Sequence, residues 1–402
     1  MSGCGPAGHK SGPTLAAVLR LGLSGAAPKL PSHHWKILRA LLACRTPVLG
    51  GHRYLCPDCG RSHFVPHSCR NRHCPLCQGQ AAHRWLERQE AALLPVPYFH
   101  LVFTLPHELN PLLQQNQRAL YQLLFEAASQ TLLEFGQNRW QAQPGITAVL
   151  HTWSQTLLDH YHLHCLVTGG GLAGQGRRWV AASPYYLFPV QALSKVFKGK
   201  FCAGLQRLYA AGQLEFHGRL APWAARPIFQ QRVRQAARRA WVVYAKRPFA
   251  GPQQVLAYLS RYTHRVAISP RRLLRVEEPA QTVLFAWKDY AQGGRRRTMT
   301  LSAAEFVRRF CLHVLPARFV KIRHFGFLSN RQRQTRVAQA RALLQPDLCP
   351  AAAPPQPRPA CATPAEAPPG RVCPYCGGKR LWLLEVVPAG LIPCWPPRLD
   401  SS

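Results

Sequence analysis

The stretch His160-Tyr161-His162-Leu163-His164-Cys165-Leu166-Val167 decides how the rest of this chain is interpreted. In an extended strand, alternate side chains point to the same side, so His162 and His164 share one face of a sheet. Two imidazoles side by side form a clamp for a metal ion. An isolated pair of this kind is more often two hydrogen-bonded histidines on a sheet face, so the neighbouring segments must decide between the two interpretations.

Segments on both sides of this stretch predict further strands. Residues 146 to 157 and 162 to 168 are two β-rich runs joined by a short polar turn, which predicts an antiparallel hairpin. Gly169-Gly170-Gly171 closes the second run, and it lacks the Gly-Lys-Ser/Thr that phosphate-loop nucleotide binding requires. Residues 96 to 106 read as a buried strand and residues 111 to 136 as an amphipathic helix. A second domain is expected to begin at this strand.

The remaining elements follow from periodicity and turn residues. Residues 14 to 45 repeat apolar side chains at helical spacing, and Val266-Ala267-Ile268 reads as a short strand. Residues 282 to 290 and 295 to 301 predict another hairpin, followed by a helix over residues 303 to 314.

A pair of tyrosines lies on the helix predicted over residues 252 to 263. Tyr258 and Tyr262 are four residues apart and so share one helical face, with Arg261 and Arg265 beside them. Two such phenols could simply be core or rim aromatics, but their neighbours are polar and basic. A tyrosine attacks a phosphodiester when the phosphate charge is offset and the leaving oxygen is stabilised, which a divalent ion and arginines supply. The histidine pair and the tyrosine pair therefore explain each other.

Cysteine spacing indicates a zinc site ahead of these segments. Residues 50 to 78 are too poor in aliphatic side chains to bury a core, and they carry two Cys-x-x-Cys pairs with 14 residues between them, typical of a tetrahedral zinc site. Cys69 and His73 lie beside the second pair, and either could replace one ligand. The expected ligands are Cys56, Cys59, Cys74 and Cys77.

Another pair, Cys373 and Cys376, resembles half of a second zinc site. The remaining cysteines near it, Cys349, Cys361 and Cys394, do not form a second pair. We interpret this segment as a partial zinc knuckle whose partners the sequence does not reveal.

Charge points to a polyanionic partner. The 402 residues include 51 Lys and Arg against 16 Asp and Glu, a net charge of +35, and the arginines are spread along the whole chain. Nucleic acid fits this distribution better than a membrane surface does, and we expect Arg70, Arg72, Arg261 and Arg265 to contact DNA. No apolar run approaches the roughly 18 residues needed to span a bilayer. The protein is expected to be cytoplasmic and associated with the nucleoid, with its cysteines reduced.

Taken in order, these segments resemble one known family, the two-tyrosine transposases of rolling-circle insertion sequences, which are members of the His-hydrophobic-His endonuclease superfamily. The resemblance covers most of the chain, except the tail after Asn330. A proline is common in the family where this chain has Tyr161, which leaves both histidines of the pair in place. The segments that carry the resemblance are 68–77, 99–107, 151–155, 162–165, 258–266, 309–316 and 322–326.

The resemblance implies a fold and a reaction. The expected fold is α+β, a central antiparallel sheet with flanking helices that carries the histidine pair on a middle strand and is preceded by a small zinc-binding module. The expected reaction nicks and rejoins single-stranded DNA, at element ends and at the target, through a 5′-phosphotyrosine bond. Mg²⁺ or Mn²⁺ would be the catalytic ion and Zn²⁺ the structural one. A third ligand is expected from the strand before the pair; Gln155 is the first choice, with His151 and His160 as alternatives.

Four parts are expected along the chain. They are a helical lead-in at residues 1–49, a zinc-binding domain at 50–95, a tyrosine nuclease domain at 96–345, and a Pro/Ala-rich linker and tail at 346–402. The sequence does not reveal the oligomeric state.

Two other functions remain open at this point. A plasmid replication initiator or a relaxase would use the same chemistry, and a non-catalytic zinc-ribbon protein would satisfy the charge and the cysteine pairs equally well. A hydrolase of the His-x-His-x-Asp-His type is excluded, because Cys165-Leu166-Val167 follows His164, which leaves Leu166-Val167 where that site needs Asp-His.

Overall fold

A six-stranded antiparallel sheet forms the centre of the molecule, as the computed structural model shows for residues 12–25, 29–90, 92–246, 255, 263–345 and 372–390. Its strands run in the order β11-β4-β5-β3-β7, and β6 pairs with the far end of β5. The strands are β3 (Tyr98–Thr104), β4 (Gln143–Trp153), β5 (Asp159–Ala173), β6 (Arg178–Ala181), β7 (Val243–Lys246) and β11 (Ile322–Gly326). The expected α+β fold with a central antiparallel sheet is confirmed.

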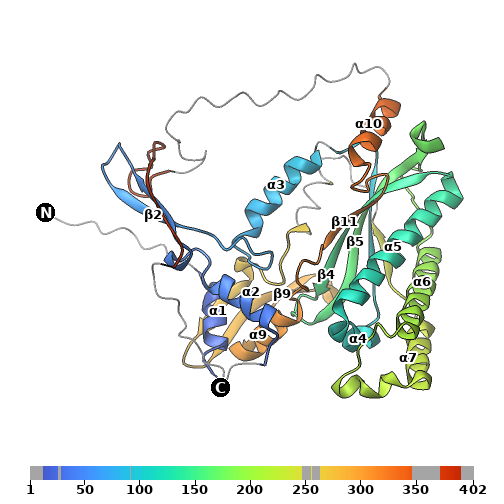
Figure 1. The fold of residues 1–402 in the computed structure, drawn as a ribbon, viewed down its shortest axis with the longest axis horizontal. Coiled ribbons are helices and arrows are strands. Elements are labelled where there is room, and N and C mark those ends of the chain that lie inside the picture. The colour runs from blue at the N-terminus through green and yellow to red at the C-terminus, as the bar shows by residue number, and fades with distance from the viewer. Residues whose placement is uncertain are drawn as a thin grey trace.

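Helices cover one face of this sheet, and Figure 1 shows them stacked beside it on the right. They are α4 (Asn110–Gln115), α5 (Gln117–Trp140), α6 (Val190–Ala210) and α7 (Arg226–Arg238). The largest apolar core lies between these helices and the sheet residues that point toward them, among them Phe103, Leu163 and Val167. Since side chains alternate along β5, this packing leaves His162 and His164 on the opposite face.

A smaller sheet with its own helices forms a second core. It consists of β8 (Leu273–Glu277), β9 (Thr282–Asp289) and β10 (Arg295–Ser302), and it packs with α9 (Ala303–Leu312), α1 (Leu15–Gly22) and α2 (Ser32–Leu42). At Gly22 a side chain would lie 2.5 Å from the carbonyl oxygen of Ala303, so α1 and α9 touch backbone to backbone. The helices of the expected lead-in at residues 1–49 therefore do not form a core of their own, because they share one with residues 267–311.

The third sheet joins distant parts of the chain. Its strands are β1 (Gly51–Leu55), β2 (Ser62–Pro66) and β12 (Trp382–Val387), with β1 in the middle. Figure 1 shows this sheet at one end of the molecule, where red β12 lies beside blue β1 and β2.

Two further helices are α3 (Gln78–Glu90) and α10 (Arg333–Leu344). Short 3₁₀ helices are found at Pro47–Leu49, His107–Leu109, Gly174–Gly176, Gly218–Ala224, Pro270–Arg272 and Tyr290–Gln292.

Several predicted elements change in detail. The glycines at 169–171 do not close the hairpin, because β5 continues through them to Ala173 and pairs there with β4 and β6. Gly170 has a φ of 143°, and a side chain on it would meet the carbonyl of Val180 on β6 at 2.5 Å. The expected strand at residues 266–268 is wrong, because Ala267 and Ile268 are buried in the second core without pairing to a strand.

The helical predictions are confirmed where the structure describes them. Residues 14–45 contain α1 and α2, residues 111–136 lie within α4 and α5, which are separated at Asn116, and residues 303–314 contain α9. The hairpin at 282–301 is β9 and β10. The expected helix over 252–263 falls outside the described residues, except Val255 and Thr263.

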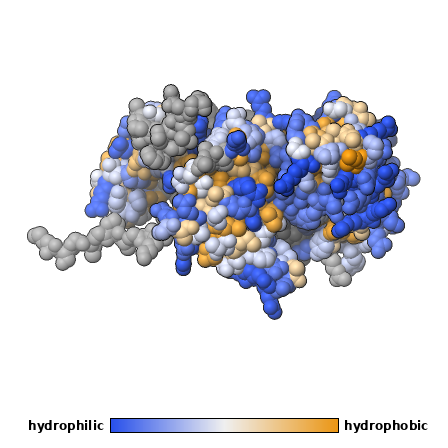
Figure 2. All heavy atoms as spheres, turned by 90° about the horizontal axis from the view of Figure 1, so that it is seen from below, coloured by the Kyte–Doolittle hydropathy of each residue, from blue (hydrophilic) through white to orange (hydrophobic). Residues whose placement is uncertain are grey.

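The exposed surface is largely hydrophilic at one end of the molecule. Figure 2 shows the molecule from below, with hydrophilic side chains over most of the end formed by the helical layer and apolar residues scattered toward the middle. Among the described helices, none is long and apolar enough to cross a membrane.

Candidate functional site

Three histidines meet on the face of the central sheet opposite the helical layer. His162 and His164 lie on β5, and the antiparallel register places His151 of β4 directly opposite His162. Directly opposed residues of an antiparallel pair point to the same face, so all three imidazoles share one side of the sheet. Their ligand nitrogens lie within 4.8 Å of one another.

The spacing of these nitrogens fits a metal ion. Nε2 of His162 and Nε2 of His164 are 3.1 Å apart. Two nitrogens bound at about 2.1 Å to one ion, at a right angle, would be about 3 Å apart. The His151 ring meets the His164 ring edge to face at 4.5 Å between centroids, which completes a triangle of donors.

Burial keeps two of these imidazoles ready to bind a cation. All three side chains are less than a tenth exposed. Burial lowers the pKa of His162 to about 3, and it lowers the pKa of His164 well below its usual value, with neighbouring histidines adding to the effect. A neutral imidazole is the form that ligates a metal, so His162 and His164 keep a free lone pair at neutral pH.

Hydrogen bonds fix two of the three rings. Nδ1 of His162 is 2.8 Å from the carbonyl oxygen of His160, to which it donates. Nδ1 of His164 is 2.9 Å from Nε2 of His100 on β3, and the two rings are stacked. In each case the bond occupies Nδ1 and directs Nε2 toward the centre of the cluster, as partners of metal-bound histidines do.

The expected third ligand, Gln155, lies in the turn between β4 and β5, where its backbone carbonyl accepts a hydrogen bond from Arg272. His160 contributes its carbonyl to His162 and its ring contacts His107. The histidine cluster instead contains His151, which the sequence offered only as an alternative. The register of β4 against β5 explains why His151 and not Gln155 lies beside the pair. His151 is opposite His162, whereas β4 ends at Trp153 and Gln155 lies beyond that end.

Tyr258, Tyr262 and Arg261 fall outside the described residues. The nearest residues that the structure describes on either side of this stretch are Val255 and Thr263. Val255 is buried against Leu166 and Tyr98, which lie on the same face of the sheet as the histidines. Thr263 is fully buried.

The other expected DNA contacts differ from one another. Arg70 is exposed and has a positive φ of 51°. Arg72 is half-buried, and its guanidinium donates to the carbonyl of Phe319, so it is engaged within the protein. Arg265 is partly buried and lies near enough to His162 and His164 to lower the pKa of both.

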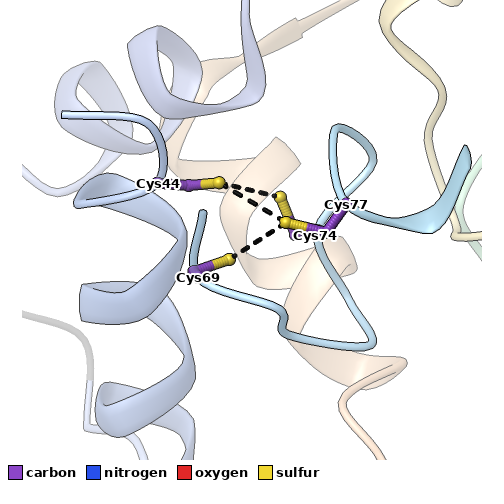
Figure 3. Close-up of side chains that lie close together, drawn as sticks. All are labelled: Cys44, Cys69, Cys74 and Cys77. Carbon is purple, nitrogen blue, oxygen red and sulfur yellow. Dashed lines mark hydrogen bonds between the residues drawn. The ribbon is translucent and has the colours of Figure 1, made fainter. Parts of the chain in front are cut away.

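Four cysteines converge between α2 and the loop before α3, as Figure 3 shows. Cys44 follows α2 (Ser32–Leu42), and its Sγ lies 3.5 Å from that of Cys74 and 3.6 Å from that of Cys77. Cys69 completes the group at 3.7 Å from Cys77. Four thiolates around one Zn²⁺ at about 2.3 Å have sulfurs about 3.8 Å apart, so these residues fit a zinc ion.

The expected zinc ligands are therefore divided between two groups. Cys74 and Cys77 belong with Cys44 and Cys69, whereas Cys56 and Cys59 lie with Cys373 and Cys376. The hairpin of β1 and β2 separates them, because one pair follows its tip at Leu55 and the other follows its base at Pro66. A five-residue strand spans roughly 15 Å, too far for one ion.

Only part of this arrangement had a signal in the sequence. Cys69 stood beside the second pair and was considered as a replacement ligand. Cys44 is not part of a Cys-x-x-Cys pair, so spacing alone could not indicate it. The domain boundary expected at residue 49 also passes through this group of cysteines.

The chain matches two known families. Residues 145–336 match the family described as "Putative transposase", and residues 22–105 match the family described as "Transposase zinc-binding domain". The putative transposase y4qJ of Sinorhizobium fredii is 44% identical over 340 residues, which cover 83% of this chain and 85% of that protein. The transposase for insertion sequence element IS801 of Pseudomonas savastanoi pv. phaseolicola is 32% identical over 297 residues, which cover 72% of this chain and 69% of that protein.

Two solved structures of a conjugative relaxase, TrwC, in complex with oriT DNA also align with this chain. The metal-bound structure covers 42% of this chain and 71% of its own, with 14% identity and a TM-score of 0.23. The metal-free structure gives a TM-score of 0.20. At these TM-scores the alignments are not evidence of a shared arrangement.

Proposed function

This chain belongs to the transposase family of these relatives. From that membership we propose that it cuts and rejoins single-stranded DNA through a phosphotyrosine bond. The reaction would take place at a metal ion held by His151, His162 and His164. The observation that carries the proposal is the convergence of three buried imidazoles on one face of the central sheet. Three imidazole donors on rigid strands are what a catalytic ion needs, since they leave its other positions for substrate oxygens.

The ligand set indicates which ion the site would prefer. Imidazole suits transition metals, whereas carboxylate and carbonyl oxygens suit Mg²⁺. With a third imidazole in place of an amide oxygen, the site should favour Mn²⁺ over Mg²⁺. When bound, the ion would supply Lewis acidity and position the scissile phosphate.

The nucleophile would be a tyrosine. Tyr258 and Tyr262 follow Val255, and Val255 packs on the histidine face of the sheet. In the proposed step a phenol oxygen bonds to phosphorus and loses its proton, while the bond from phosphorus to the 3′ oxygen of the preceding nucleotide breaks and that oxygen gains a proton. The 5′ phosphate stays on the tyrosine. Because this bond conserves the phosphodiester energy, rejoining needs no nucleotide hydrolysis.

Arg265 lies close to the histidines and Lys321 lies against Arg265, and these two cationic side chains would offset the phosphate charge. Arg265 acts electrostatically on two of the imidazoles. Lys321 lies against the carbonyl of Arg265, and burial, with Arg72 nearby, lowers its pKa to about 8. Desolvated cations stabilise a developing oxyanion more strongly than exposed ones do. We assign Arg265 and Lys321 this role, and we assign Arg70 a contact with the DNA backbone.

Two tyrosines would allow two covalent strands. On a rolling-circle scheme one phenol holds the 5′ end of the donor strand and frees a 3′ hydroxyl for synthesis, and the other acts when the target is cut or the cycle ends. A replication initiator or relaxase would use the same step, but the relatives that share two thirds or more of their length with this chain are transposases.

The proposal is tested by looking for the covalent bond. Purified protein is incubated with single-stranded oligonucleotides from the element ends and Mn²⁺, and adducts are separated on a denaturing gel. We expect Tyr258→Phe and Tyr262→Phe each to form some adduct, the double variant to form none, and either single change to block transposition in cells. Tyr290→Phe, an exposed tyrosine on another element, is the matched control.

An adduct from the double variant would move the nucleophile to another residue. Complete absence of adduct from the wild-type protein, with DNA binding retained, would favour the non-catalytic DNA-binding alternative.

A further inference from the structure

The sequence Cys-Pro-x-Cys-Gly occurs twice, at residues 56–60 and at residues 373–377. Both copies fold in the same way. The amide of Gly60 donates to the carbonyl of Cys56 at 2.8 Å, and the amide of Gly377 donates to the carbonyl of Cys373 at 2.9 Å. Both glycines have the positive φ that such a turn requires, 69° and 75°. The chain therefore contains two equivalent turns of the kind that presents a pair of thiolates.

The structure brings these two turns together from opposite ends of the chain. Sγ of Cys56 lies 3.6 Å from Sγ of Cys376, and Sγ of Cys59 lies 3.7 Å from Sγ of Cys373, although each pair is separated by more than 300 residues. All four sulfurs lie within 4.8 Å of one another. These separations match the roughly 3.8 Å expected between thiolates that share one Zn²⁺.

Other contacts cross between the same two segments. β12 (Trp382–Val387) adds to β1 as a third antiparallel strand, from Gly51 opposite Val387 to Leu55 opposite Trp382. Each turn also receives a cation from the other: Arg380 forms an ion pair with Asp58, and the guanidinium of Arg61 lies 5.2 Å from the ring centroid of Tyr375. Strand pairing, an ion pair and a cation–π contact therefore join the two segments.

This small unit has little else to hold it together. Its apolar core consists of Tyr54 and Leu381 with the cysteines themselves, and much of β12 is exposed, including Trp382, Leu384 and Val386. Surface ion pairs and one cation–π contact contribute little to stability. A core of this size usually depends on a metal or on disulfides.

We propose that Cys56, Cys59, Cys373 and Cys376 bind a second zinc ion, which fastens the C-terminal segment 372–390 to the N-terminal zinc-binding module. The chain then holds two zinc ions at the two ends of the β1–β2 hairpin. The partial knuckle expected in the tail is then completed by the first cysteine pair, and segment 372–390 of this tail is a structural part of the N-terminal module.

The proposal is tested first by counting zinc in the full-length protein. Native mass spectrometry of wild-type protein, purified under reducing conditions with zinc present, should show two ions. The Cys373→Ser/Cys376→Ser variant should show one, as should Cys69→Ser/Cys77→Ser, because each removes a different site. Cys202→Ser, a half-buried cysteine in neither group, should keep two.

A second measurement does not depend on a correctly folded serine variant. A specific protease site is inserted between residues 350 and 351, outside the described segments, and the protein is cut after it has folded. We expect the C-terminal fragment to remain with the body during gel filtration and to be released when a chelator removes the zinc.

Four results would overturn the proposal. Two come from counting zinc: a single ion in the wild-type protein, or two ions in Cys373→Ser/Cys376→Ser. The other two come from the cut protein: a fragment that separates immediately after cutting, or a fragment that a chelator leaves attached and only a reducing agent releases, which would indicate disulfides. None of these readouts involves DNA cleavage, so they are independent of the proposed tyrosine chemistry.

Discussion

His100 contacts His164 and is expected to set the orientation of its ring, although His100 itself lies outside the ligand cluster. Its Nε2 is 2.9 Å from Nδ1 of His164, and the other nitrogen of His164 faces His162. A partner on Nδ1 fixes the ring orientation and the tautomer that leaves Nε2 free. We therefore interpret His100 as a positioning residue.

This interpretation predicts the effect of His100→Leu. Loss of the partner should weaken Mn²⁺ binding by about 10- to 100-fold in titration calorimetry, the usual effect of removing such a contact. His100→Gln, which retains a polar partner, should recover part of the affinity. His324→Leu is the control, since His324 lies on the same sheet face but bonds to Thr147. Equal affinities for wild type and His100→Leu, with unchanged folding, would show that the contact has no such role.

The identity of the third metal ligand is tested by comparing His151 with Gln155. We predict that His151→Ala lowers both Mn²⁺ affinity and the cleavage rate strongly, as His162→Ala and His164→Ala should, because each removes one donor of the cluster. Gln155→Ala should have a weak effect, because Gln155 lies in the turn beyond the end of β4. Metal titration and single-turnover cleavage distinguish the two. If Gln155→Ala proves as damaging as His151→Ala, the assignment drawn from the register is incorrect.

At the scale of elements, the sequence predicted what depends on neighbours in the chain. The pairing of β9 with β10 and the shared face of His162 and His164 follow from alternation over a few residues. The place of His151 depends on the register of β4 against β5, which shifts by one residue between His151 and Trp153, near the turn. Spacing in the sequence therefore predicts that a metal ligand lies near the end of β4, but it does not identify which residue this is.

Contacts between distant elements were beyond such reasoning. A Cys-x-x-Cys pair shows that a turn can present two thiolates, but it does not identify the other two. Here the β1–β2 hairpin separates the two nearby pairs, and each finds its partners elsewhere, in Cys44 and Cys69 or in Cys373 and Cys376. The sharing of one core by α1, α2 and α9 was hidden for the same reason.

The Cys44 group connects elements and should matter for stability. Cys44 follows α2, which packs in the second core, while Cys74 and Cys77 precede α3. We predict that Cys44→Ser loses one zinc and lowers the Tm by about 10 °C or more, because structural zinc supplies much of the folding free energy of such a module. Differential scanning fluorimetry and zinc analysis measure both effects, with Cys202→Ser as the control. An unchanged Tm in a variant that has lost this zinc would show that the ion is dispensable.

At the scale of the whole molecule, the central sheet separates two tasks. One face is closed by the helical layer and holds the main core, and the other carries the histidines, with Arg265 close to two of them. The +35 charge extends far beyond this site, so affinity for DNA and cleavage of DNA should depend on different residues. We therefore expect His162→Ala to bind single strands almost as tightly as the wild type while cutting none.

The salt dependence of binding tests which arginines contribute to this affinity. For single-stranded DNA, the logarithm of the binding constant falls with the logarithm of salt concentration by about 0.7 for each phosphate contacted. We predict that Arg70→Ala and Arg265→Ala each reduce this slope by about 0.7, measured by fluorescence anisotropy between low and physiological salt. Arg72→Ala should instead lower the Tm with little change in slope, because its guanidinium donates to the carbonyl of Phe319. Arg234→Ala, on α7 in the layer opposite the histidines, should change neither quantity. A slope lowered equally by Arg234→Ala and Arg265→Ala would mean that the strand binds over the whole basic surface and not along the histidine face.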